Sequence, residues 1–308
     1  MEAMLLILAY LVIGLVLKRT HIMPVNTGQV LNQYVINVAV PAMILLHLPH
    51  LEITRDVLLP ALVPWLLFPI SVGLVLLFSK LLRWERELTG ALLIVVPLGN
   101  TSFLGFPMVE AFFGSAGLPY AVIYDQLGSF IALAFFATLF AAIYSNREED
   151  QSKPTPSAIA KKFLTFPPVI ALMIAILFGM QRYPETLHTL ISTLAATLVP
   201  VVMIAVGFQL HFRILKEDVV PFTIAMLIKL FVLPAIALAV MMVFSWHGLA
   251  AQVTVLEAAM PFMITGGAVA ISAGLKPRLV ASLIGYGVLA GLITLPIWAL
   301  ILHAQLGL

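Results

Sequence analysis

Long apolar stretches alternate with short polar segments along this chain of 308 residues. A helix of about 20 apolar residues crosses a bilayer. On this length the pattern predicts ten membrane-spanning helices, at residues 3–17, 27–48, 57–78, 88–112, 117–143, 164–180, 186–211, 219–244, 250–274 and 279–303. The segment 145–162 is rich in charged residues, Ser and Pro and is too short for a domain, so we interpret it as a linker.

The predicted span 88–112 carries prolines and polar residues at its centre. Its run VVPLGNTSFLGFP places Pro97 and Pro107 around Asn100, Thr101 and Ser102. Proline lacks an N–H and clashes with the preceding helical turn. Freed backbone groups at membrane depth are tolerated only inside protein or beside a watery cavity. The pattern therefore predicts a broken helix that lines a site, as secondary transporters use.

The composition agrees with a membrane protein and excludes several other classes. The chain is 62% hydrophobic and 10% charged, and its mean hydropathy of +1.11 is far above that of a soluble domain. It contains no cysteine, which excludes disulfides and thiolate chemistry. The net charge of +2 and the absence of a basic tract give no sign of a nucleic-acid partner. The expected fold class is an all-α polytopic protein of the cell's inner (plasma) membrane.

The basic residues fall mainly into the segments that follow odd-numbered spans. Loops with an excess of Lys and Arg stay in the cytoplasm. Both termini are therefore expected outside. The N-terminal apolar stretch lacks a basic start and a cleavage site, so we interpret it as the first span and not as a signal peptide. Of the 16 basic residues, Lys229 is expected within a span, Arg55 and Arg182 outside, and the following on the cytoplasmic side: Lys18, Arg19, Lys80, Arg83, Arg86, Arg147, Lys153, Lys161, Lys162, Arg213, Lys216, Lys276 and Arg278.

The two halves of the chain share landmarks that predict an inverted repeat. Residues 1–144 and 163–308 each hold five predicted spans, so the second half must insert upside down. Prolines recur in matching spans, among them Pro97 in span 4 and Pro261 in span 9. Inverted-topology repeats are typical of secondary transporters, with the substrate site near the membrane midplane. The breaks of spans 4 and 9 are therefore expected to meet, and half-helix N-termini there would favour an anion.

Three motifs resemble those of the auxin efflux carrier family. They are NVAVP in span 2, GNTSFLGFP in span 4 and YDQLGSF in span 5, and the resemblance covers essentially the whole chain. The short linker is similar to that of the bacterial members, the malate and malonate permeases, so auxin itself is not the expected substrate.

The resemblance implies a sodium/proton-antiporter-like or bile-acid-symporter-like fold. Helices 1, 2, 6 and 7 would form a scaffold, and helices 3–5 and 8–10 a mobile transport unit with helices 4 and 9 crossed at their breaks. It further implies a secondary carrier of small organic anions with an elevator-type mechanism and a homodimer formed through the scaffold.

Polar and small residues at the two breaks are the candidate substrate contacts. Each also has a structural explanation, since polar side chains can re-satisfy freed backbone groups and small residues allow close packing. The resemblance also suggests that Asn37, four residues before Pro41, faces the substrate. The full candidate set is Asn37, Asn100, Thr101, Ser102, Pro107, Pro261, Thr265, Gly266 and Gly267.

Three ionisable residues lie inside predicted spans, where charge is expensive and usually functional. Asp125 and Glu257 could carry a coupling ion, H⁺ or Na⁺, and Lys229 could compensate substrate charge. Lys229 could equally form an ion pair with Asp125 or Glu257, which we slightly favour. Gln126 would point about 100° away from Asp125 on a regular helix.

The leading hypothesis is thus a carrier of small carboxylates without a cofactor or metal. The first alternative is cation-coupled transport through Asp125 and Glu257, and a channel or membrane sensor is a weaker one. The sequence contains no phosphate-binding, hydrolase or metal-ligand motif, so an enzyme is not expected.

Overall fold

The computed structural model describes residues 2–50, 54–145, 161, 164–178, 184–210 and 214–307. All regular elements in these ranges are helices, which confirms the expected all-α class. Most of the predicted linker 145–162 lies outside the described residues.

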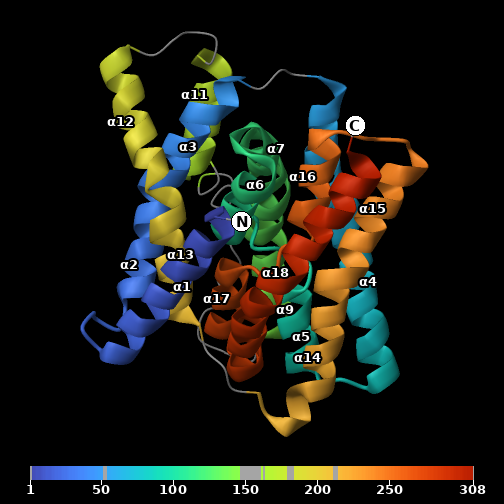
Figure 1. The fold of residues 1–308 in the computed structure, drawn as a ribbon. Helices are drawn as coiled ribbons and strands as arrows, with labels where there is room; N and C mark the ends of the chain where they lie inside the picture. Colours follow the sequence, from blue (N-terminus) through green and yellow to red (C-terminus); the bar gives the residue numbers. More distant parts are fainter. Residues whose placement is uncertain are drawn as a thin grey trace.

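One group of helices comes from predicted spans 1, 2, 6 and 7. It consists of α1 (Glu2–Thr20), α2 (Thr27–Tyr34), η1 (Val35–Ala39), α3 (Val40–His47), α11 (Pro167–Phe178), α12 (Glu185–Ala196) and α13 (Leu198–Gln209). These helices pack mainly on one another and lie together on one side of the molecule (Figure 1). We call them the scaffold group.

Close backbone packing joins α1 to α13 within the scaffold group. A Cβ added at Gly14 would lie 2.1 Å from the carbonyl oxygen of Ile204, and one at Gly207 would lie 2.1 Å from that of Leu11. Small residues of this kind let membrane helices approach closely, since lipid itself gives no hydrophobic drive for association. The scaffold group is therefore held by tight glycine contacts.

The second group, which we call the transport group, comes from the other predicted spans. Its first part comprises α4 (Leu58–Leu82), α5 (Arg86–Val95), η4 (Thr101–Gly105), α6 (Phe106–Phe113), α7 (Leu118–Tyr124), η6 (Asp125–Ser129), α8 (Phe130–Ala132), η7 (Leu133–Ala137) and α9 (Thr138–Tyr144). Its second part comprises α14 (Val219–Leu227), η9 (Ile228–Val232), α15 (Leu233–Val243), α16 (Leu249–Ala258), α17 (Ile264–Ser272) and α18 (Pro277–Leu306). Short turns precede α4, α7 and α14 at η3 (Arg55–Val57), η5 (Ser115–Gly117) and η8 (Lys216–Asp218), and η2 (Leu48–His50) follows α3.

Seven continuous helical segments in the described part of the chain are long and apolar enough to cross a membrane. The three other predicted spans fall on shorter helices. Span 6 corresponds to α11, whereas spans 4 and 9 are each split in two, at the segments 96–100 and 259–263. A polytopic membrane protein is thus confirmed, while the count of ten spans, the inverted repeat and the position of the termini stay predictions.

Two widened π-helical turns place charged residues inside the transport group. Asp125 begins η6 and Lys229 lies in η9. Such turns free backbone carbonyls, and π-bulges often mark functional sites. The indole N–H of Trp65 donates to the carbonyl of Leu127 at 2.9 Å, and that of Trp298 donates to Leu230 at 2.9 Å. Each widened turn is therefore held by a tryptophan from a neighbouring helix.

Candidate functional site

The two helix breaks lie against each other and are joined by backbone hydrogen bonds. The N–H of Asn100 donates to the carbonyl of Pro261 at 2.7 Å, and the N–H of Met263 donates to Leu98 at 3.1 Å. Gly99 and Phe262 face each other as an antiparallel bridge. The segments 98–100 and 261–263 therefore form one unit, which we call the crossover, and the predicted meeting of the breaks is confirmed.

Two half-helices begin at the crossover and leave backbone donors free. In the described part of the chain, no acceptor is recorded for the N–H groups of residues 101–103, at the start of η4. The same holds for residues 264–266, at the start of α17. The N-terminal end of a helix carries a partial positive charge, so two such ends favour a negatively charged group nearby.

A cavity of about 230 Å³ lies beside both half-helix starts. We call it the crossover cavity. It lies between the scaffold group and the transport group, and most of its wall is apolar. Its lining residues are Ile36, Val40, Ser102, Phe103, Asp125, Gln126, Phe130, Leu133, Ala134, Thr138, Phe166, Pro168, Met263, Thr265 and Val269.

Asp125 is held by three side-chain donors at the wall of this cavity. Its Oδ1 accepts hydrogen bonds from Thr101 Oγ1 at 2.5 Å and Ser102 Oγ at 2.5 Å. Its Oδ2 accepts one from Gln126 Nε2 at 2.7 Å. Three donors on a buried carboxyl group stabilise its ionised form. The hydroxyl groups predicted to contact substrate thus donate to Asp125, while no acceptor is recorded among the described residues for the backbone N–H groups of Thr101 and Ser102.

In the described part of the chain, two buried amide side chains near the crossover have one atom without a hydrogen-bond partner. These are Nδ2 of Asn100, a residue with 2% of its surface exposed, and Oε1 of Gln126, with 1% exposed. A buried amide atom without a partner destabilises the protein unless a ligand or water satisfies it. Asn100 was a candidate from the sequence. Gln126 was not, because the π-turn η6 that brings its amide to Asp125 leaves no recognisable pattern in the sequence.

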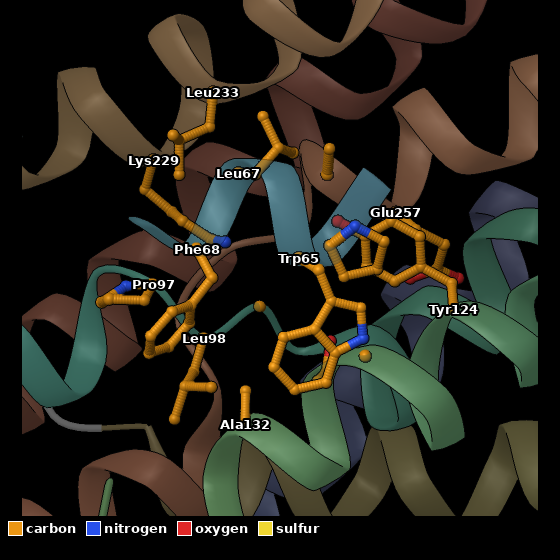
Figure 2. A pocket seen from close by; sticks show the side chains of 15 residues that line it. Trp65, Leu67, Phe68, Pro97, Leu98, Tyr124, Ala132, Lys229, Leu233 and Glu257 are labelled. Carbon is orange, nitrogen blue, oxygen red and sulfur yellow. The ribbon is translucent and has the colours of Figure 1, made fainter. Parts of the chain in front are cut away.

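The remaining charged candidates line a smaller void at the crossover. It measures about 20 Å³, enough for about one water, and Lys229, Glu257, Gly99, Tyr124 and Trp65 are among its lining residues. Figure 2 shows Lys229 and Glu257 lining it together with the Trp65 and Phe68 rings. We call it the crossover void.

In the described part of the chain, Lys229 forms no direct ion pair with either carboxyl group that the sequence suggested as its partner. Among the described residues, the recorded ion pair joins Lys276 to Glu85, and Lys229 makes no direct pair with Asp125 or Glu257. Asp125 already has three donors, and the Glu257 carboxyl group lies against Gly105. The direct ion pair slightly favoured from the sequence is therefore absent.

Several candidates from the sequence pack against protein instead of the crossover cavity. A Cβ at Gly266 would meet Leu98 Cδ1 at 3.0 Å, and one at Gly267 would meet Ile284 Cδ1 at 2.2 Å. Pro107 is buried at the start of α6 and lines none of the cavities described above. The structure gives these residues packing roles, and a part in binding stays a prediction.

Thr265 and Asn37 are both exposed, but in different places. Thr265 lines the crossover cavity. Asn37 lies in η1 of the scaffold group, where its Nδ2 donates to the carbonyl of Gln33 at 2.7 Å, while its neighbour Ile36 lines the cavity. The buried ring of Pro261 faces Gly291 of α18. Of the predicted substrate contacts, Ser102 and Thr265 line the cavity, as does the predicted coupling residue Asp125.

Comparison with known proteins gives a consistent result. The model of the family described as "Membrane transport protein" matches residues 1–299. An uncharacterized transporter of Methanothermobacter thermautotrophicus is 29% identical over 304 residues, covering 98% of both chains. An uncharacterized transporter of Methanocaldococcus jannaschii is 27% identical over 316 residues, again covering 98% of both chains. The chain therefore belongs to the membrane transport protein family, that of the auxin efflux carriers, and the resemblance seen in the sequence is confirmed.

Proposed function

We propose that this transporter is a secondary carrier of small organic anions, chiefly carboxylates, which bind in the crossover cavity. The observation that carries the proposal is the pair of half-helix starts beside this cavity, with free N–H groups at residues 101–103 and 264–266. A carboxylate accepts hydrogen bonds from such donors and gains from both helix dipoles. Asn100 does not line the cavity, but its buried Nδ2 at the crossover has no recorded partner in the described part of the chain, and we propose that it donates to the anion when the site is occupied.

The size and lining of the crossover cavity support a small substrate with a short carbon skeleton. Sites for drug-sized ligands measure roughly 300–1,000 Å³. The crossover cavity is smaller, at about 230 Å³, and side chains such as Phe103 and Leu133 line it. A carboxylate of a few carbons fits this volume, with its charged end at the half-helix starts and its carbon skeleton against the apolar wall.

The contacts between the two groups of helices support alternating access. The main contacts of the scaffold group with the transport group run to η4, α6 and α7, and not to α5 or α17. Residues Ala250–Ala258 of α16 are all buried, whereas Thr265 and Ala268 of α17 are exposed. The open side is therefore the one toward which α17 runs from the crossover.

A second cavity extends this open side. It measures about 420 Å³ and lies between α1, α2 and α13 of the scaffold group and α17 and α18 of the transport group. With the basic loops in the cytoplasm, this conformation is inward-facing. A slide of the transport group along the scaffold group, in an elevator-type cycle, would expose the crossover cavity to the other side. A homodimer through the scaffold group would hold the scaffold still in the inner membrane.

The alternative is cation-coupled transport, in which Asp125 and Glu257 bind H⁺ or Na⁺. Two buried carboxyl groups close to the crossover favour it. In the described part of the chain, no three His, Asp or Glu side chains converge as metal ligands. The alternative concerns the coupling ion and is compatible with an organic anion as the substrate.

Exchange across liposome membranes tests the proposed function. Purified protein is reconstituted into liposomes loaded with unlabelled malonate, and uptake of radiolabelled malonate is followed, with malate, succinate, indole-3-acetate and choline as competitors. The proposal expects saturable exchange that carboxylates inhibit and choline does not. The proposal would be overturned if the protein exchanged labelled choline and exchanged no carboxylate.

A further inference from the structure

Glu257 is a carboxyl group in an unusual environment at the end of α16. Its side chain is fully buried, at 0% exposure, and among the described residues neither Oε1 nor Oε2 has a hydrogen-bond partner. An ionised carboxylate without donors in a dry interior is strongly destabilising. In this conformation the group is therefore neutral, with a proton on one oxygen.

Gly105 makes room for this carboxyl group. A Cβ at Gly105 would lie 2.5 Å from Glu257 Oε2 and 2.7 Å from Oε1. Gly105 ends the η4 turn, and Ser102 of the same turn lines the crossover cavity. Glu257 thus lies within about one helical turn of the proposed anion site, although it does not line it.

Three groups act on Glu257 from the elements packed around it. They are Asp125 from η6, Lys229 from η9 and Tyr124 from α7. Glu110 in α6 and His303 in α18 lie near the ends of those helices that are remote from the crossover. Lys229 shares the crossover void with Glu257, and this void has room for about one water to relay a proton.

The charges around the crossover couple protonation of Glu257 to binding of the anion. Asp125 lies at the cavity wall and Glu257 lies behind the η4 turn, so the protonation of Glu257 changes the negative charge close to a bound anion. Loss of the Glu257 proton adds one negative charge there and disfavours an anion in the adjoining cavity. Coupling of this kind is reciprocal: protonation of Glu257 increases affinity for the anion, and the anion increases affinity for the proton.

We propose that Glu257 is the proton-binding group that couples anion transport to the pH gradient, an inference that rests on the proposed function. The carboxylate takes up one proton on the side where the anion binds. It gives up this proton on the other side after the anion leaves, and no bond other than O–H forms or breaks. Transport is then proton–anion symport.

The test uses the same liposomes with an imposed pH gradient and the membrane potential clamped with valinomycin and potassium. With one proton per anion, a gradient of one pH unit, acidic outside, should drive about tenfold malonate accumulation by the wild type. Glu257→Gln keeps the shape of the protonated carboxyl group, so it should retain malonate exchange and lose the accumulation. Glu110→Gln, at an exposed carboxyl group of α6, is the matched control and should accumulate malonate as the wild type does.

The outcomes separate the two proposals. Wild-type exchange without pH-driven accumulation overturns proton coupling and leaves the proposed function standing. Accumulation by Glu257→Gln equal to that of the wild type overturns the role of Glu257. An absence of carboxylate exchange in the wild type contradicts the proposed function itself.

A second measurement does not need a substrate. The infrared absorbance spectrum of the wild type at neutral pH should contain the carbonyl band of the protonated Glu257 carboxyl group, which subtraction of the spectrum of Glu257→Gln isolates. The band should be missing in Glu257→Gln. A wild-type spectrum without this band, or an unchanged band in the variant, would overturn the protonated state.

Discussion

The backbone N–H of Asn100 donates to the backbone carbonyl of Pro261 at 2.7 Å, and this bond ties the two broken helices together. Because it involves main-chain atoms alone, replacement of the Asn100 side chain leaves it in place. The side-chain amide, whose Nδ2 is buried and unpartnered, is then free to serve a ligand. Substitution of the Asn100 side chain can therefore test the function of the crossover while the backbone hydrogen bond to Pro261 stays in place.

Gly105→Ala should disturb coupling through the Glu257 carboxyl group. The added Cβ would overlap both carboxyl oxygens, and overpacking of this kind is destabilising by about 1–3 kcal/mol. We expect a lower melting temperature and loss of pH-driven malonate accumulation. Gly73→Ala in α4 is the control, because among the described residues no atom beyond the adjoining backbone of α4 lies within 4 Å of its added Cβ, and alanine favours helix by about 0.5–1 kcal/mol. Equal behaviour of the two variants would contradict this account of Gly105.

Lys229→Met should weaken anion binding by about tenfold. It removes the amino group that, in its protonated form, offsets the negative charge of a bound anion. A unit charge contributes about 1–2 kcal/mol over roughly 10 Å at an effective dielectric constant of 20. The measurement is equilibrium binding of radiolabelled malonate to purified protein at neutral pH. Lys80→Met, at an exposed lysine in the last turn of α4, is the control and should leave the affinity unchanged. A wild-type affinity in Lys229→Met would show that the charge of Lys229 does not contribute to anion binding.

Thr265→Cys should react from the cytoplasmic side. The chain has no cysteine of its own, so a single-cysteine variant reports one position. Thr265 is exposed beside the crossover cavity, whereas Val255 in α16 is 0% exposed. A membrane-impermeant maleimide should label Thr265→Cys in inside-out vesicles and spare Val255→Cys. Preferential labelling of Thr265→Cys in right-side-out vesicles would contradict the expected orientation or the inward-facing state.

Lys276→Gln should slightly lower stability by freeing a loop of the transport group. Lys276, between α17 and α18, pairs with Glu85, and its N–H donates to Glu87 Oε1 at 3.1 Å. A hydrogen bond from Lys276 to Glu85 raises the pKa of Lys276 above its usual value of 10.5. The stability that Lys276 contributes through this pair is therefore complete at pH values below the usual pKa of 10.5. It is lost as the pH rises through the raised pKa of the folded protein.

The pH dependence gives this stability prediction its check. Exposed ion pairs contribute roughly 0.2–1 kcal/mol, so a small decrease in melting temperature is expected. The difference between wild type and Lys276→Gln should be constant around neutral pH and should shrink at strongly alkaline pH. A difference that grows with pH would show that the pair is not its source.

Much of the crossover could be predicted from local sequence because local chemistry causes it. Pro97 and Pro261 cannot continue the helical hydrogen-bond ladder, so both breaks can be located without a structure. The long apolar helices such as α4 and α18 follow equally directly from hydropathy.

The contacts around the charged residues could not be predicted, because they depend on how distant helices pack. Gln126 reaches Asp125 through the widened turn η6, although neighbours on a regular helix point about 100° apart. Glu257 lies against Gly105 because α16 packs beside η4. The expected ion pair of Lys229 fails for the same reason, since packing gave both carboxyl groups other surroundings.

Malonate uptake by Asn100→Ala tests the central claim, binding of an organic anion at the crossover, most directly. Initial rates of radiolabelled uptake into liposomes are compared for the wild type, Asn100→Ala and Asn26→Ala, whose exposed side chain makes no capping bond at the start of α2. Loss of a buried donor to a charged ligand should reduce affinity by about tenfold or more. At malonate concentrations below saturation, the account predicts similar initial rates for the wild type and Asn26→Ala and a rate lower by about tenfold or more for Asn100→Ala. Undiminished uptake by Asn100→Ala would contradict it.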